Sequence, residues 1–115
     1  MISQISCNNV LHNKLGIEVA RKELERALAD TTEIDILEKN ELLIKNESTA
    51  ISVAEPILFV IYGKSKIEDE KPYEAYLINN YWVINGTLNR FSLGGSFLII
   101  IDAKNSKVLE ITHYK

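Results

Sequence analysis

The spacing of apolar residues along the chain changes once, close to Gly63. Before that position, apolar side chains recur every three or four residues over Leu15 to Ala29 and again over Asn46 to Tyr62. This spacing places them on one face of a helix, so the first half of the chain predicts two amphipathic helices. From Tyr73 onward the apolar residues recur at every second position, which is typical of strands with one buried face. The pattern therefore predicts helices first and a sheet after them.

The second helix carries signals at both ends. Asn46 or Ser48 is the expected N-cap, because the short polar side chain of either residue can accept a hydrogen bond from a free backbone N–H. Gly63 suits the position just after the helix, where a positive φ ends it without a clash. The run from Ile57 to Ile61 is apolar almost all round, and we expect it to be deeply buried.

Four segments of the second half have the alternation or the apolar content of strands. They are Tyr73–Asn79, Tyr81–Leu88, Phe97–Asp102 and Lys107–His113. Asn79-Asn80 and Asn85-Gly86 both suit a tight hairpin turn. The first is preferred, because the second would leave only a stub of strand beside it. Phe97–Asp102 is apolar on both faces, which predicts a central position in the sheet.

Two connecting segments are less regular. Thr32 to Lys45 alternates apolar and charged residues, so it fits either a short half-buried strand or a connector with a helical turn. Lys64 to Lys71 is rich in charge and is expected to be a loop. Pro72 follows it and is placed to open the first strand rather than to interrupt one.

Helices followed by a four-stranded antiparallel meander define an α+β fold. We expect a single domain over residues 1–115, with an N-terminal helical part over 1–45 and a helix plus meander over 46–115. The helices pack on the sheet, because four strands with one apolar face need a cover. Bends would curve the sheet around the helix into a cystatin-like cone. They are expected at three glycines, Gly86, Gly94 and Gly95.

Composition narrows the classes of partner. The chain has 115 residues and a formal net charge of −3. Residues 18–55 hold ten acids and five bases, whereas residues 56–115 hold six acids and seven bases. No basic patch of the kind that binds nucleic acid is visible. The acidic surplus of residues 18–55 indicates either a surface for a basic partner or a solvated helix face. No run of about 18 apolar residues predicts a membrane span.

Cys7 is the only cysteine of the sequence. Neither an internal disulfide nor a thiolate metal cage is therefore expected. A lone thiol fits a cytoplasmic protein. The alternative is a periplasmic or lipid-anchored protein whose leader was removed before Cys7, because the preceding Ile5-Ser6 is what such a leader would leave.

Candidate catalytic chemistry is sparse, and no spacing of His, Asp or Glu indicates a metal site. His113 could form a dyad with Asp102, but only through the fold. Such a dyad would lie in a hollow lined by Tyr62, Tyr76 and Trp82. The alternative is that these aromatic side chains belong to the core and that His113 is a strand-end residue with a satisfied hydrogen bond.

The second half also carries an ordered series of motifs. It runs through Ile61-Tyr-Gly-Lys64, Ile67, Lys71-Pro-Tyr73, Tyr81-Trp-Val-Ile-Asn-Gly-Thr-Leu88, Gly94-Gly95 and Val108-Leu-Glu-Ile-Thr-His-Tyr-Lys115. In order and spacing this series resembles bacterial immunity proteins of the nuclear transport factor 2-like fold, which are encoded beside toxins in polymorphic toxin systems. The resemblance covers about residues 47–115.

The resemblance implies that the chain binds and neutralises a cognate toxin by protein–protein contact, without enzymatic activity and without a cofactor. It implies a structural role for the residues of the shared pattern, which are Tyr62, Gly63, Pro72, Trp82, Gly86, Gly94, Gly95 and His113. Contacts to the toxin must lie elsewhere, because related proteins discriminate between partners. The expected contacts are aromatic residues and an acidic triplet, namely Tyr73, Tyr81, Glu68, Asp69 and Glu70.

Two alternatives to this function remain at this stage. One is a small-ligand-binding domain or an enzyme that uses a pocket between the helix and the curved sheet. The other is a homodimer that pairs through the exposed face of the sheet.

Overall fold

The computed structural model describes residues 12–30 and 41–115. The chain forms two compact units, Met1–Asp35 and Ile36–Lys115. The sequence predicted one domain with an internal boundary after residue 45. Ile44, which lies just before that boundary, is buried in the core of the second unit.

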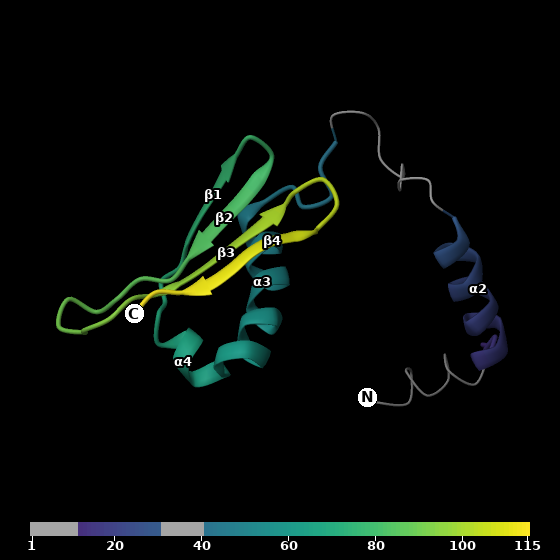
Figure 1. Ribbon diagram of the computed structural model, residues 1–115, viewed down its shortest axis with the longest axis horizontal. Helices are drawn as coiled ribbons and strands as arrows, with labels where there is room; N and C mark the ends of the chain where they lie inside the picture. The colour runs from purple at the N-terminus through teal and green to yellow at the C-terminus, as the bar shows by residue number, and fades with distance from the viewer. Residues whose placement is uncertain (1–11, 31–40) are drawn as a thin grey trace. The chain divides into compact units, whose positions relative to one another are not determined.

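The first unit contains helix α2, Ile17–Ala29 (Figure 1). It confirms the helix predicted from Leu15 onward, although its first turn begins two residues later. Gly16 precedes it with a φ of 87°, a conformation that an L side chain rarely adopts. Cys7 lies outside the described residues.

Helix α3, Glu47–Tyr62, has the ends that the sequence predicted. The Asn46 side chain accepts a hydrogen bond from the backbone N–H of Thr49 at 2.8 Å, so Asn46 rather than Ser48 is the N-cap. Gly63 follows the helix with a φ of 95°, which is the left-handed conformation expected of a glycine in this position.

One side of α3 is buried, through Ala50, Ala54 and Leu58. The expectation that the whole run Ile57–Ile61 is deeply buried was wrong. Within this run only Leu58 is fully buried, and Val60 is 87% exposed. A helix that packs on a sheet covers it with one side only, so a continuous apolar run still turns some residues toward solvent.

The charged segment after Gly63 is a short helix, α4, Lys64–Glu68, and not the expected loop. Ile67 is its one apolar residue and is fully buried. The backbone N–H of Glu70 donates to the carbonyl of Ile67 at 2.9 Å, which continues the turn beyond the helix. A single buried anchor thus fixes a charged segment and places Glu70 three residues after that anchor, on the same side of the turn.

The sheet is antiparallel and has the strand order β1-β2-β3-β4. Its strands are β1 (Glu74–Ile78), β2 (Tyr81–Asn85), β3 (Phe97–Asp102) and β4 (Val108–His113). All four predicted strands are present, and β3 is an inner strand as expected. The β1–β2 turn lies at Asn79 and Asn80, whose φ angles of 50° and 67° are both positive, as a tight hairpin requires. The α+β fold class is confirmed.

The glycines that were expected to bend the sheet lie outside its strands. Gly86 follows β2, and Gly94 and Gly95 lie near the end of the long connection to β3, which projects beyond the sheet in Figure 1. The irregular pairing within the sheet lies between Ile100 and Ile101, where the β3–β4 register shifts. The glycines therefore shape the connection rather than the strands.

The two faces of the sheet differ. One face packs with α3 and contributes alternate residues of β2 and β3 to the core, namely Trp82, Ile84, Ile99 and Ile101. The opposite face is more exposed, and one row of cross-strand neighbours on it consists of Tyr76, Val83, Ile100 and Glu110. The space between α3 and the sheet is thus occupied by side chains of the core.

Residues 41–46 form a connector and not a strand. The N–H of Ile44 donates to the carbonyl of Ala103 at 2.9 Å. The indole N–H of Trp82 donates to the carbonyl of Ile44 at 3.0 Å. These two bonds attach the connector to the sheet, and Trp82 itself is buried in the core. The rest of the ambiguous segment, residues 32–40, lies outside the described residues.

Candidate functional site

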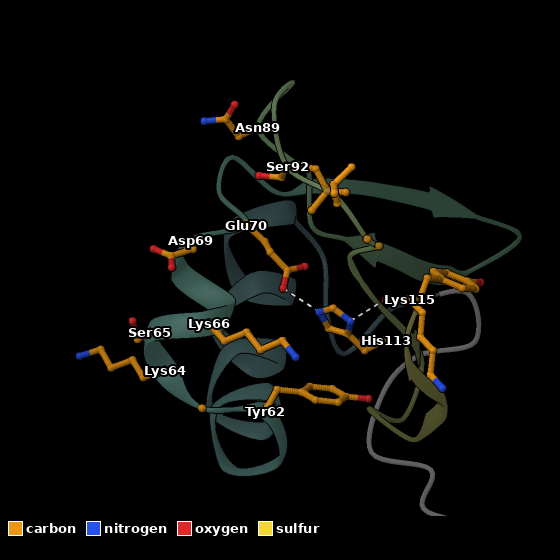
Figure 2. Close-up of a pocket in the computed structure, with 16 residues that line it drawn as sticks. Tyr62, Lys64, Ser65, Lys66, Asp69, Glu70, Asn89, Ser92, His113 and Lys115 are labelled. Atoms are coloured by element: carbon orange, nitrogen blue, oxygen red, sulfur yellow. Dashed lines mark hydrogen bonds and ion pairs between the residues drawn. The ribbon is translucent and has the colours of Figure 1, made fainter.

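An open pocket of about 1020 Å³ lies beside the end of the sheet (Figure 2). Three segments line it, namely the end of α3 with α4, the connection from β2 to β3, and the end of β4. Glu70 and His113 lie within it, and Figure 2 shows their side chains pointing toward each other. The lining segments are distant in sequence, so the pocket exists only in the folded unit.

Glu70 and His113 form a largely buried polar pair. The Nε2 atom of His113 lies 2.8 Å from Oε2 of Glu70, and the two side chains are 15% and 7% exposed. The other carboxylate oxygen of Glu70 accepts the backbone N–H of Phe97 at 2.8 Å. The Nδ1 atom of His113 lies 2.9 Å from the carbonyl of Tyr114. Every polar atom of both side chains therefore has a partner.

Backbone contacts hold Glu70 in place from the side of β2. The carbonyl of Glu70 accepts the N–H of Thr87 at 2.8 Å. Gly86 lies directly against the glutamate, since a Cβ atom at position 86 would stand 2.6 Å from Oε1 and 2.7 Å from Cβ of Glu70. Glycine is needed at position 86 because of this close approach.

Four further residues of the shared pattern line the same pocket, namely Tyr62, Gly63, Gly94 and Gly95. The ring of Tyr62 lies 5.3 Å from the ring of His113, centroid to centroid, at an angle of 57°, and both line the pocket. A Cβ atom at Gly95 would collide with Tyr114, so this glycine lets the β2–β3 connection pack against the end of β4. Pro72 lies just before β1, in a cis peptide bond with Lys71.

The predicted dyad of His113 and Asp102 was wrong. His113 pairs with Phe97 at the other end of β3, and Asp102 instead accepts the N–H of Lys104 in the following turn at 2.8 Å. The predicted hollow is also absent from the described residues, because Trp82 is 5% exposed in the core. The alternative interpretation of His113, a strand-end residue with a satisfied hydrogen bond, is the one observed.

The residues expected to contact a partner differ in exposure. Asp69 is exposed and lines the pocket, while Glu68 is half-buried and lies 4.0 Å from the ammonium of Lys71. Tyr81 is half-buried on the more exposed face of the sheet. Glu70 is only 5% exposed, because its pair with His113 holds it inside the fold, so it offers little surface to a partner.

Tyr73, the fifth expected contact, is also engaged within the fold. Its hydroxyl donates to Glu55 at 2.8 Å, and its ring meets that of Phe97 edge to face at 5.3 Å. Burial, and after it the hydrogen bond to Glu55, raise the pKa of the Tyr73 phenol above its usual value. Tyr73 thus offers only part of its surface to a partner.

Within the described residues, no three side chains of His, Cys, Asp or Glu are grouped as a metal site would require. In the same part of the chain, no helix has the length and apolar character to cross a membrane.

Residues 49–115, from the first turn of α3 onward, match the family described as NTF2 fold immunity protein. The chain belongs to this family. The matched residues include α3 from Thr49 onward, α4, all four strands and the whole lining of the pocket. The resemblance inferred from the motifs is therefore confirmed, and the pocket is a feature of an NTF2 fold immunity protein.

Two curated proteins of Escherichia coli (strain K12) are similar to this immunity protein. The uncharacterized protein YhhH is 35% identical over 74 residues, which are 64% of this chain and 58% of YhhH. The uncharacterized protein YbbC is 37% identical over 73 residues, 63% of this chain and 60% of YbbC. The chain spans about three fifths of the length of these relatives. No solved structure matches it.

Proposed function

We propose that this chain is the antidote of one cognate toxin, which it neutralises by stoichiometric binding and without catalysing a reaction. The observation that carries the proposal is the match to the immunity family over residues 49–115. That range holds all four strands, α3 from Thr49 onward and every buried core residue except Ile44.

The state of the Glu70–His113 pair supports binding rather than catalysis. A general base needs a ring nitrogen or a carboxylate oxygen free to reach a substrate proton. In this structure both ring nitrogens of His113 and both oxygens of Glu70 are engaged by other groups of the protein. The pair therefore acts as a structural connection between the segment after α4 and the end of β4.

Contacts with the toxin are proposed for exposed and half-exposed residues. Of those expected from the sequence, Asp69, Glu68, Tyr81 and the accessible part of Tyr73 stay in the proposal. A homodimer through the more exposed face of the sheet also stays a prediction, and light scattering of the purified protein would measure it.

Co-expression tests the proposed function. The gene adjacent to that of this chain is expressed in a sensitive bacterium, alone and together with this chain. We expect arrest of growth by the toxin alone, restored growth in the presence of this chain, and a one-to-one complex on gel filtration. A toxin from an unrelated system serves as the control and should not be neutralised. Growth arrest that persists, with no complex, would refute the proposal.

A further inference from the structure

The pocket has a positive lining in a chain whose net charge is −3. Lys64 and Lys66 reach it from α4, and Lys115 reaches it from the end of β4. All three are exposed. No ion pair involves any of them in the part of the chain that the structure describes. Figure 2 shows the ammonium of Lys66 directed toward Tyr62 and His113.

The acidic groups of the lining do not cancel these lysines. Among the described residues, Glu70 is paired with His113 and with the N–H of Phe97, and not with a lysine. Asp69 is the other acidic side chain of the lining, and in Figure 2 its carboxylate points away from Lys66. The pocket therefore presents exposed ammonium groups that have no acidic side-chain partner in the described part of the chain, and a ligand of opposite sign would complement them.

The β2–β3 connection exposes two large apolar side chains, one of which lines the pocket. Leu93, which lines it, is 98% exposed, and Phe91, in the same connection between β2 and β3, is 86% exposed. A turn fixes this part of the connection, since the side chain of Asn89 accepts the N–H of Phe91 at 2.9 Å and its carbonyl accepts the N–H of Ser92 at 2.8 Å. Large apolar side chains held in solvent beside a charged pocket are typical of a protein-binding surface.

We propose that this pocket binds an acidic segment of the toxin. In this arrangement a carboxylate of the partner lies against Lys66 and Lys64, and an apolar residue next to it packs on Leu93 and Phe91. The inference rests on the proposed function and adds to it the surface and the chemistry of the partner. A nucleic acid is the less suitable anion, because a chain of net charge −3 repels a long run of phosphates.

Charge reversal tests the inference. Lys64→Glu/Lys66→Glu changes the pocket, and the matched control Lys104→Glu/Lys107→Glu makes the same change of net charge around the exposed β3–β4 turn. All four lysines are exposed, so both variants should fold, which circular dichroism verifies. The probe is the toxin encoded by the adjacent gene, purified with an inactivating substitution. Titration calorimetry at two salt concentrations measures the Kd.

We expect the pocket variant to raise the Kd at least tenfold and to reduce its dependence on salt, while the control stays within about threefold of the wild type. An acid-to-lysine substitution in the toxin should restore binding to the pocket variant. If both variants bind like the wild type, the pocket inference is overturned and the proposed function stands. If the wild type itself does not bind the toxin, the proposed function fails.

A labelled single-stranded oligonucleotide separates the two kinds of anion. Weak or no binding by the wild type supports the assignment to a protein segment. Tight binding that is lost in the pocket variant, together with unchanged affinity for the toxin, would overturn that assignment.

Discussion

Substitution of Glu70 by alanine should destabilise the second unit far more than a surface change would. The side chain is 7% exposed and forms two hydrogen bonds, one that it accepts from the N–H of Phe97 and one with Nε2 of His113, both at 2.8 Å. Removing it leaves a buried backbone N–H unsatisfied, which costs about 1–3 kcal/mol. It also removes the hydrogen bond to His113, and such bonds contribute roughly 0.5–3 kcal/mol across neutral and ionised pairs.

These two losses are not simply additive, because water from the open pocket can replace part of the second one. We therefore expect Glu70→Ala to lower the free energy of unfolding by about 3 kcal/mol. For a unit of this size, about 3 kcal/mol corresponds to a fall in Tm of roughly 12–24 °C. Glu70→Gln is the matched control. Its amide oxygen can accept from Phe97 and its NH₂ can donate to a neutral His113, so it should cost about 1 kcal/mol or less.

The assay is urea denaturation followed by fluorescence. Trp82 is the only tryptophan of the sequence and is 5% exposed, so its emission reports directly on the core of the second unit. A cost below about 1 kcal/mol for Glu70→Ala, or equal costs for the alanine and glutamine variants, would refute the reasoning, because the two hydrogen bonds would then not be the source of the stability.

Three further predictions concern other contacts of the second unit. Burial, and then a hydrogen bond to a nearby glutamate, raise the pKa of Tyr73. As the pH rises, this phenol therefore ionises in the unfolded chain before it ionises in the folded one. Its contribution to the free energy of unfolding is complete below about pH 10 and falls as the pH rises further. Tyr73→Phe should make that alkaline fall shallower in urea titrations between about pH 9 and 11, and an unchanged slope would contradict this. Gly86→Ala should cost about 1–3 kcal/mol, because the new methyl group meets Glu70, and a chemical denaturation midpoint equal to that of the wild type would show that the glutamate shifts freely. Trp82→Phe should cost about 2–4 kcal/mol, since it leaves the carbonyl of Ile44 without its donor and removes part of a large core side chain. Circular dichroism is the probe for this variant, and a cost within 1 kcal/mol would mean that water satisfies the carbonyl.

The elements of the fold were predictable where the signal is local. The capping group of Asn46, the glycine at position 63 and the change of apolar period each act over a few residues, and each was read correctly. The turn at Asn79 and Asn80 belongs to the same class, because it depends on the φ preference of two adjacent residues. Local physical chemistry therefore fixed the order of the helices and strands.

Features that depend on tertiary packing were missed. A single buried side chain, Ile67, makes a helix of the charged segment, and no periodic pattern reveals one residue. Periodicity also did not show that Val60 would face solvent, because it does not say which side of an apolar helix meets the sheet. The position of Glu70, three residues after Ile67, is a local signal that its side chain lies on the buried side of the turn. Its pairing with His113 has no such signal, because the two residues are 43 positions apart in the sequence.

The simple order of the strands has a consequence for kinetics. Each strand pairs only with its neighbours in sequence, so the sheet can assemble one hairpin at a time, which favours rapid folding. The contact between Glu70 and His113 joins a residue just before β1 to the last residue of β4, so it can form only after the hairpins between them are in place. We expect that weakening it accelerates unfolding and leaves the folding rate almost unchanged. The pair would then govern the lifetime of the native state rather than the speed at which that state is reached.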